Sequence, residues 1–284
     1  MSNDRDIMGV LVLNYRLNIL KSKYNLSCLV TNNVSSKSRI FLEKNSIKII
    51  NINFFENLEK MKIDKDKIDI LYNKQTFGKL FIFLVNNKCI YLDSDLYINQ
   101  NIDHLFEYNT SEKKIYMTND LLMIKKNSDS DDSDDSWTLL NINNKFNSGL
   151  IILEGNENIF RDICNYIIST DIEVMNKWHS DQIILNVLYQ NNTINVTTLD
   201  HKYNLIFNST DFFIETKLIN ENDIYVVHYT LSNKPWLVES LNKSGGDYCK
   251  KYWLKWYKAY YDFQESNFND SNLKYKNIIC LNTK

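Results

Sequence analysis

The sequence predicts an α/β fold in which a mainly parallel sheet is flanked by helices. Short apolar runs typical of strands alternate with segments of helical periodicity through most of the 284 residues, as they do in βαβ units. Hydrophobic residues make up 44% of the chain and charged residues 24%, the proportions of an ordinary globular protein. Because a chain of this length can bury one large core, we expect residues 1–284 to form a single domain.

The expected elements follow from these two periodicities. The first long helical pattern, residues 7–21, precedes two apolar runs at 27–31 and 47–52. Further short runs rich in Ile, Val and Leu predict strands, and apolar residues spaced three and four apart predict helices. The remaining expected strands are 89–92, 114–118, 146–153, 194–198 and 224–228, and the remaining helices are 157–168, 180–189 and 248–263.

Two segments differ from this alternation in composition. The stretch "KKNSDSDDSDDSW", residues 125–137, is too polar and too uniformly charged to join a core, so it predicts an acidic surface loop. A metal-binding or phosphate-regulated role is the alternative. The helix at 248–263 mixes Lys with Trp and Tyr; we expect it to pack on its own domain or across a dimer, with base stacking or membrane contact as alternatives.

Composition argues against several classes of partner. With 33 basic and 35 acidic residues the net charge is −2, so no nucleic-acid partner is expected. No apolar run is long enough to span a membrane and no leader opens the sequence, so we expect neither a membrane span nor secretion. The abundance of Asn, Ile, Lys and Asp suggests an AT-rich genome, such as that of a large DNA virus. Five scattered cysteines favour a reducing, cytoplasmic compartment: Cys28, Cys89, Cys164, Cys249 and Cys280.

The strand expected at 89–92 ends on two carboxylates, Asp93 and Asp95. Ligands bind beyond the carboxyl ends of strands in open α/β sheets, and side chains two residues apart in an extended segment point the same way. Two such carboxylates repel each other unless a cation lies between them. Because they are hard oxygen ligands, they suit Mg²⁺ or Mn²⁺ bound together with a phosphate-bearing substrate. The alternative is a helix cap or loop pair.

Four further motifs accompany this acidic pair. They are "FGKLFIF" at 77–83, "FNSG" at 146–149, "HSDQIILN" at 179–186 and "VVHYTLSNKPW" at 226–236. Taken singly, each lysine would be a surface charge, and the histidine that closes the strand before "KPW" would be structural.

Together and in this order, the motifs resemble those of glycosyltransferase family 8, the glycogenin-like group. The family pattern consists of a K-L-x-x-F/W segment, an L-D-x-D strand end followed by N-I-D-x-L-F, then FNSG, D-Q-x-x-L-N and finally H…KPW. This chain has "KLFIF", "IYLDSD" with "NIDHLF", "FNSG", "DQIILN" and "VVHYTLSNKPW". The resemblance implies a GT-A-type, Rossmann-like fold and a retaining transferase that moves a hexose from a UDP-sugar to an acceptor.

The resemblance also assigns roles to particular residues. It implies that Mn²⁺, with Mg²⁺ as a substitute, is held by Asp93, Asp95 and His228. It makes Asp181 the carboxylate beside the anomeric carbon, as nucleophile or as electrostatic stabiliser, with Lys79 supplying positive charge to the same reaction. The residues that it places on the donor substrate are Asp93, Ser94, Asp120, Asn147, Ser148, Gln182 and Lys234.

The chain departs from the family pattern in three places. Almost nothing precedes Asn3, where the family has its usual first strand. Either the true start lies upstream, or something else fills the gap, or nucleotide binding is weakened. A glycine expected before "KPW" is replaced by Leu231 or a neighbour, which weakens one expected phosphate contact. The position of the glycogenin acceptor tyrosine falls on Asp211, so self-glucosylation there is not expected.

Several alternatives stay open at this stage. UDP-glucose is the donor we favour, with UDP-galactose and UDP-N-acetylglucosamine as rivals. Protein, glycan and lipid acceptors remain open, and so does self-modification at another residue. A homodimer is expected by analogy alone. The competing hypothesis is a degenerate family member that binds a nucleotide sugar or a partner with little turnover.

Overall fold

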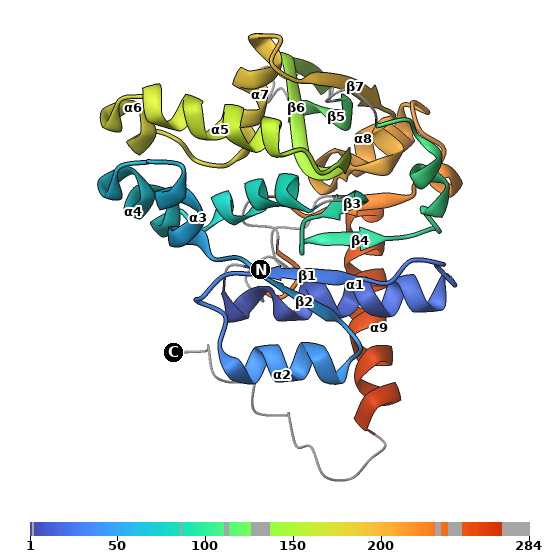
Figure 1. Cartoon of the computed structure of the whole chain (residues 1–284). Helices are drawn as coiled ribbons and strands as arrows, with labels where there is room; N and C mark the ends of the chain where they lie inside the picture. The colour runs from blue at the N-terminus through green and yellow to red at the C-terminus, as the bar shows by residue number, and fades with distance from the viewer. Residues whose placement is uncertain are drawn as a thin grey trace.

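The computed structural model describes residues 1, 3–85, 87–110, 114–125, 137–230, 234–237 and 246–268. Figure 1 shows helices packed around three groups of strands. The α-helices are α1 (Ile7–Ile19), α2 (Ser36–Lys44), α3 (Phe54–Lys60), α4 (Lys65–Asn73), α5 (Glu157–Ser169), α6 (Ile172–Asn176), α7 (Gln182–Gln190), α8 (Thr210–Glu215) and α9 (Asp247–Phe268). Short 3₁₀ segments join them: η1 (Asp4–Asp6), η2 (Thr76–Leu84), η3 (Asp103–Glu107), η4 (His201–Tyr203), η5 (Phe207–Ser209) and η6 (Glu221–Asp223).

The strands form three sheets. The first pairs β1 (Ser27–Val30) with β2 (Lys48–Asn51), and the third has the order β4 (Leu96–Ile98), β9 (Val226–His228), β8 (Leu205–Ile206). The second sheet has the order β3-β6-β5-β7. Its strands are β3 (Lys88–Leu92), β5 (Lys114–Lys125), β6 (Trp137–Glu154) and β7 (Asn195–Leu199).

Pairing between strands is mixed, and the expectation of a mainly parallel sheet was wrong in this respect. The pairs β1–β2, β5–β7 and β8–β9 are parallel, whereas β3–β6, β5–β6 and β4–β9 are antiparallel. The antiparallel pair of β5 with β6 is also longer than the apolar cores at 114–118 and 146–153 indicated. Residues 126–136, most of the predicted acidic loop, lie outside the described residues. The α/β class is as expected.

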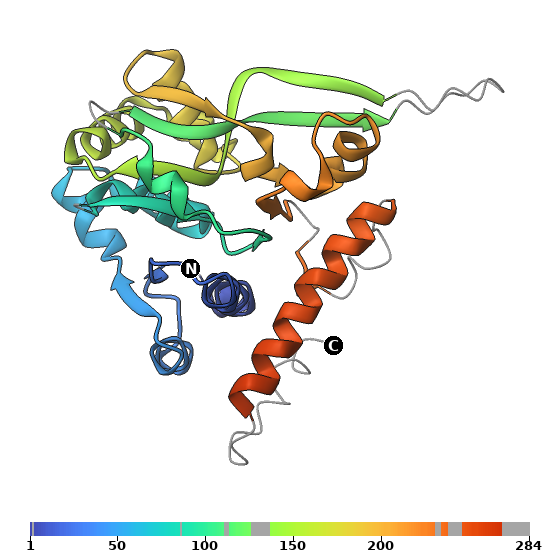
Figure 2. The same cartoon turned by 90° about the vertical axis from the view of Figure 1, so that its right-hand side faces the viewer.

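Helix α9 closes one side of the molecule, as Figure 2 shows. Its aromatic face is interior: Tyr252, Trp253 and Trp256 are buried in a cluster with residues of α8 and β9. The start of α9 is held by Asp211 of α8, whose carboxylate accepts backbone N–H groups from Tyr248 (2.9 Å) and Cys249 (3.3 Å). Negative charge at a helix start complements the exposed N–H groups there. The residue at the family's acceptor-tyrosine position therefore caps a helix.

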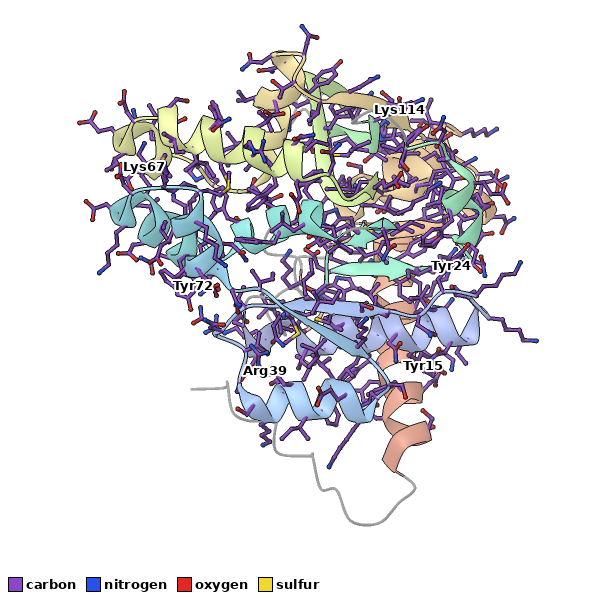
Figure 3. All side chains as sticks on the ribbon, in the orientation of Figure 1. Tyr15, Tyr24, Arg39, Lys67, Tyr72 and Lys114 are labelled. Atoms are coloured by element: carbon purple, nitrogen blue, oxygen red, sulfur yellow. The ribbon has the colours of Figure 1, made fainter. Side chains whose placement is uncertain are left out.

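Two cations hold neighbouring segments together. Lys67 of α4, labelled in Figure 3, donates to the carbonyls of Ile167 (3.1 Å) and Ile168 (2.6 Å) at the end of α5, where the helix dipole favours positive charge. Arg39 of α2 donates to the Val34 and Thr31 carbonyls at 2.9 and 2.6 Å. It thereby fixes the chain that leaves β1.

Expected and observed elements agree closely wherever a periodic pattern was long. The helices predicted at 7–21, 157–168, 180–189 and 248–263 correspond to α1, α5, α7 and α9. The first strand of the described chain is β1, which follows α1, so within the described residues no strand precedes α1. No helix in the described part of the chain has the length and hydropathy that crossing a bilayer requires.

Replacing Trp256 by Ala should destabilise the fold. The Trp256 side chain is 1% exposed and stacks on Tyr260 with ring centroids 5.6 Å apart, so its removal leaves a cavity and costs about 3–5 kcal/mol. We expect the Tm in differential scanning calorimetry to fall by roughly 10 °C. Tyr261 on the same helix is 57% exposed, and Tyr261→Ala should leave the Tm nearly unchanged. Equal losses for the two variants would contradict an interior α9.

Candidate active site

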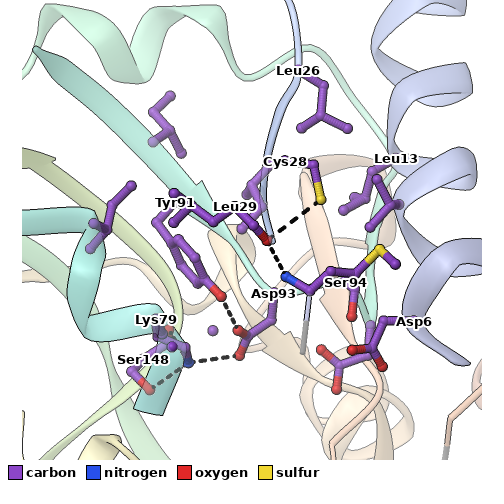
Figure 4. A pocket seen from close by; sticks show the side chains of 18 of the residues that line it. Asp6, Leu13, Leu26, Cys28, Leu29, Lys79, Tyr91, Asp93, Ser94 and Ser148 are labelled. Carbon is purple, nitrogen blue, oxygen red and sulfur yellow. Dashed lines mark hydrogen bonds and ion pairs between the residues drawn. The ribbon is translucent and has the colours of Figure 1, made fainter. Parts of the chain in front are cut away.

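All the site residues expected from the sequence line one cavity of about 910 Å³. It lies where β3 and β9 end, beside residues 147–149 within β6, and it extends between β1 and β3. Figure 4 shows part of it, with Lys79, Tyr91, Asp93 and Ser148 joined by hydrogen bonds. The expected residues gathered there are Lys79, Asp93, Ser94, Asp95, Asp120, Asn147, Ser148, Asp181, Gln182, His228 and Lys234.

Asp93, Asp95 and His228 form a cluster that could hold a metal ion. One ligand atom from each lies within 4.8 Å of the others. His228 Nε2 is 3.4 Å from Asp95 Oδ1 and 4.0 Å from Asp93 Oδ2. The pairing of β4 with β9 sets His228 opposite Leu96, the residue after Asp95. The register of that antiparallel pair thus brings together residues far apart in sequence.

The tautomer of His228 is set by Asn204, which follows η4. Asn204 Oδ1 lies 2.9 Å from His228 Nδ1, while its amide Nδ2 donates to Asn147 Oδ1 (2.8 Å) and Thr118 Oγ1 (3.0 Å). Because Oδ1 can only accept, Nδ1 carries a proton, and the neutral form of the ring has its lone pair on Nε2, where it could bind a metal. In metal sites, a hydrogen-bond acceptor at the other ring nitrogen orients the histidine in the same way.

A glycine makes room for the histidine ring. A Cβ at Gly149 would lie 2.2 Å from His228 Cε1 and 2.4 Å from Nδ1, which no side chain could satisfy. The same residue accepts the backbone N–H of Asp93 at 2.8 Å through its carbonyl. Gly149 therefore fixes one carboxylate and admits the imidazole beside it.

Lys79, from η2, connects two acidic residues. Its Nζ lies 3.0 Å from Asp93 Oδ2 and 3.2 Å from Asp181 Oδ2, and it donates to Ser148 Oγ at 3.0 Å. Burial alone would lower the pKa of Lys79, but the charges of Asp181 and Asp93 outweigh it and raise that pKa above its usual value. Lys79 is therefore a permanent cation in the cavity.

Asp181 is buried at the start of α7, where Ser148 Oγ donates to it at 3.0 Å. Burial raises its pKa, Lys79 opposes this, and the neighbouring Asp93 charge adds to the increase, so the net shift is upward. An ionised Asp181 is thus held in a place that folding alone disfavours. Functional sites commonly contain such groups.

Asp95 has the opposite electrostatic balance. Burial would raise its pKa, but His228 and the ammonium of Lys234, which contacts Asp95 Oδ2, lower that pKa well below its usual value. Lys234 also donates to the Tyr229 carbonyl at 3.2 Å. Lys234 therefore lies against the acidic pair rather than at the surface.

A third group of polar side chains surrounds Asp120. Gln182 Nε2 donates to Asp120 Oδ2 at 2.8 Å, and Asn147 Nδ2 lies 3.4 Å from Asp120 Oδ1. Gln182 Oε1 in turn accepts the backbone N–H of Ser148 at 3.1 Å. The carboxylate and amides are thereby fixed relative to one another on the cavity wall, ready to meet hydroxyl groups.

Sequence reasoning missed three residues of this site. Asn204 belongs to no recognised motif, although an asparagine between two apolar runs was a weak signal. Tyr91 looked like an ordinary strand residue, yet its hydroxyl donates to Asp93 Oδ1 at 2.9 Å, and burial together with that charge raises its pKa far above the usual value. Gly9 of α1 meets the Ser94 carbonyl, where a Cβ would lie 2.0 Å away.

Comparison with known proteins now decides the family. The chain matches the family described as Glycosyl transferase family 8 over residues 3–240. The chain belongs to this family. It is therefore a glycosyltransferase, and the resemblance expected from the motifs is confirmed.

Two relatives show how far the similarity extends. Uncharacterized protein R707 of Acanthamoeba polyphaga mimivirus is 27% identical over 281 residues, which cover 97% of this chain and 88% of that protein. Glycogenin-1 of Caenorhabditis elegans is 23% identical over 270 residues, 92% of this chain but 54% of glycogenin-1. The viral relative agrees with the composition noted above.

Solved structures confirm the GT-A glycosyltransferase fold. The galactosyltransferase LgtC, in complex with donor and acceptor sugar analogues, has a TM-score of 0.60 at 14% identity, and the match covers 92% of this chain and 93% of LgtC. The bifunctional glycosyltransferase WbbM has a TM-score of 0.58 at 19% identity, covering 98% of this chain and 50% of WbbM. At these identities the likeness shows the fold alone.

Asn204→Ala should weaken metal binding. In this variant no oxygen of residue 204 accepts from His228 Nδ1, so the ring is no longer held by it in one tautomer and one orientation. Loss of such a partner typically lowers metal affinity about 10- to 100-fold. Calorimetric titration with Mn²⁺ measures the effect. Asn204→Asp keeps an acceptor oxygen and should bind Mn²⁺ more tightly than Asn204→Ala. Wild-type affinity in Asn204→Ala would show that Asn204 does not position the histidine.

Asp181→Asn should raise the Tm at neutral pH. A carboxylate whose folded-state pKa lies above the ordinary 3.8 makes folding less favourable once it is ionised, and this penalty vanishes below the unfolded-state pKa. The gain should thus be present near pH 7 and disappear as the pH falls below about 4. Lys79 keeps Asp93 as a partner in the variant. Asp171→Asn, at an exposed carboxylate, serves as the control in thermal melts at both pH values.

Proposed function

We propose that this glycosyltransferase transfers a hexose from a UDP-sugar with retention of anomeric configuration, and that it requires Mn²⁺. UDP-glucose is the favoured donor. One observation carries the proposal: the cluster of Asp93, Asp95 and His228 faces the same cavity as the buried carboxylate of Asp181 and the polar group around Asp120. A metal site, a reacting carboxylate and a hydroxyl-binding wall are thus adjacent.

The residues of the cluster fit a Mn²⁺ ion. Two carboxylates and an imidazole with a free Nε2 are ligands that Mn²⁺ accepts, with Mg²⁺ as a weaker substitute. Lys234 lies against Asp95, which indicates that this cluster needs a cation nearby. When bound, the ion would supply positive charge to the diphosphate and to the UDP that departs.

The basic residues of the chain would support the same charge. Lys79 stays protonated between Asp93 and Asp181, and Lys234 can turn from Asp95 toward a phosphate when the cluster is neutralised. Fixed charges in a buried site favour the transition state because they need little reorganisation. Ser94, whose carbonyl contacts Gly9, would bring backbone groups to the nucleotide.

Asp181 is the carboxylate proposed to act at the anomeric carbon. In the reaction the bond from that carbon to the diphosphate oxygen breaks, and a bond to an acceptor oxygen forms as the acceptor hydroxyl loses its proton. Lys79 and Ser148 hold Asp181 in place at 3.2 and 3.0 Å. It would serve either as nucleophile, giving a glycosyl intermediate, or as stabiliser of an oxocarbenium-like transition state.

Sugar selection is assigned to Asp120, Asn147 and Gln182. Their carboxylate and amide groups already contact one another, so a sugar hydroxyl that meets them finds oriented donors and acceptors. A site built around hydroxyl groups rejects sugars that lack them, because the buried polar groups would be left unpaired. A homodimer, a single domain over 1–284 and a cytoplasmic location stay predictions.

A second candidate function is donor binding with little turnover. It is favoured by the position of Asp93 directly after β3, a strand with one neighbour, β6, within the described residues. Leu231, which stands where the family pattern has a glycine, lies outside the described part of the chain. Measured turnover distinguishes the two candidates.

Mn²⁺ dependence is tested by UDP release. We expect the wild-type protein to release UDP from UDP-glucose in the presence of Mn²⁺ and to lose this activity in EDTA, because the ion neutralises the leaving group. Asp93→Ala and Asp95→Ala should each abolish release. UDP-galactose and UDP-N-acetylglucosamine serve as comparison donors.

Asp171→Ala removes an exposed carboxylate and should keep full activity, and circular dichroism checks that each variant is folded. Full activity in Asp95→Ala, or release unaffected by EDTA, would refute the metal assignment. A protein that binds Mn²⁺ and UDP-glucose but releases no UDP from any of the three donors would support the second candidate.

A further inference from the structure

A chain of amide side chains links the proposed metal cluster to the polar group around Asp120. His228 Nδ1 faces Asn204 Oδ1 at 2.9 Å, and Asn204 Nδ2 donates to Asn147 Oδ1 at 2.8 Å. At the far end Asn147 Nδ2 lies 3.4 Å from Asp120 Oδ1. His228, Asn204 and Asn147 are all buried. Because buried polar groups need their hydrogen-bond partners, the orientation of each amide constrains the next one.

The direction of the chain is set at Asn147. Its Oδ1 accepts the backbone N–H of Gly149 at 2.9 Å, and a backbone N–H can only donate. On the other side of the amide lies the carboxylate of Asp120, which can only accept when it is ionised. If the amide were turned over, its NH₂ group would face the N–H of Gly149 and its oxygen would face a carboxylate oxygen. The observed orientation satisfies both neighbours, and the reversed one satisfies neither.

Asn147 in turn orients Asn204. Because Asn147 Oδ1 is an acceptor, Asn204 must present its NH₂ group to it, which places Asn204 Oδ1 against His228. The second acceptor of Asn204 Nδ2 is the hydroxyl of Thr118, at 3.0 Å. A hydroxyl can donate as well as accept, so Thr118 would tolerate either orientation of the amide. The orientation of Asn204 therefore depends on Asn147.

This orientation matters because carboxylates lie on the opposite side of the imidazole. His228 Nε2 is 3.4 Å from Asp95 Oδ1 and 4.0 Å from Asp93 Oδ2. Negative charges at such distances favour a proton on Nε2, and a neutral ring protonated there cannot bind a metal through that nitrogen. An acceptor at Nδ1 favours the other tautomer. The amide chain and the acidic pair thus have opposite effects on the position of one proton.

We propose that Asn147 is a positioning residue, which acts through Asn204 to keep the proton of neutral His228 on Nδ1 and so leaves Nε2 free for a metal. This role rests on the proposed function, because a free Nε2 matters for transfer only if that atom binds the metal. The Nδ2 group of Asn147 belongs to the wall proposed to bind sugar hydroxyls, whereas its Oδ1 would govern the histidine. Metal and sugar would then bind to one hydrogen-bonded unit.

The tautomer of His228 tests this role in the absence of metal. Long-range ¹H–¹⁵N spectra of the full chain, labelled with ¹⁵N-histidine, show which ring nitrogen carries the proton. They are recorded at about pH 9, well above the ordinary pKa of imidazole, and His228→Gln identifies the signal. We expect Nδ1–H in the wild type and mainly Nε2–H in Asn147→Ala, because Asn204 can then turn over and donate to Nδ1.

Asn147→Asp is the matched variant. It keeps an acceptor oxygen for Gly149 and Asn204, so it should keep Nδ1–H. A merely structural role of Asn147 would lower the Tm of Asn147→Ala without moving the proton, and circular dichroism checks that each variant is folded. Nε2–H in the wild type, or the wild-type tautomer in Asn147→Ala, would overturn the proposal.

Metal affinity tests the consequence. Calorimetric titration with Mn²⁺, with no sugar nucleotide present, should show binding at least about fivefold weaker in Asn147→Ala than in the wild type. Asn147→Asp should bind Mn²⁺ more tightly than Asn147→Ala. In the Asn204→Ala background, where the link to His228 is already cut, Asn147→Ala should cause no further loss. Equal losses in the two backgrounds would contradict an action through Asn204.

The two measurements also separate this role from the proposed function. A wild-type protein that shows Nδ1–H but binds no Mn²⁺ would refute the metal-dependent function and, with it, the role of Asn147. A wild-type protein that binds Mn²⁺, together with an unchanged tautomer in Asn147→Ala, would overturn the role of Asn147 alone. Neither measurement depends on transferase activity.

Discussion

The absence of a side chain at Gly149 is the constraint on which the site depends. Its carbonyl fixes the backbone of Asp93, and the space left by the missing Cβ is taken by the His228 ring. These two contacts join the end of β3 and its neighbour β6 to β9, which belongs to another sheet. Any larger residue there would push the histidine away from the acidic pair.

Charge balance explains the rest of the cavity. Asp93, Asp95 and Asp181 lie close together, and Lys79 and Lys234 contact them. Within this group Asp181 remains unfavourably charged, whereas Asp95 is strongly stabilised as an anion. Because Lys79 is shared by Asp93 and Asp181, three carboxylates are balanced by two ammonium groups. A divalent ion would supply the missing positive charge. The arrangement suits a site whose substrate arrives together with a metal.

The scaffold around this group combines rigid and incomplete parts. Helix α9 is held by a buried aromatic cluster and by the Asp211 cap, so the wall behind β9 is firmly packed. By contrast, β3 borders an apolar space with its free edge. Within the described residues, β3, the strand that Asp93 directly follows, is therefore paired on one side only, with β6.

The sequence by itself determined the family, the helices with long periodic patterns and the motif residues that meet in the cavity. Motifs such as "LDSD" and "FNSG" carry these features because their chemistry depends on residue type and local spacing. Tertiary structure decided the mixed strand directions, the capping role of Asp211 and the partnership of Asn204 with His228. These depend on contacts between residues distant in sequence, which short-range periodicity cannot specify.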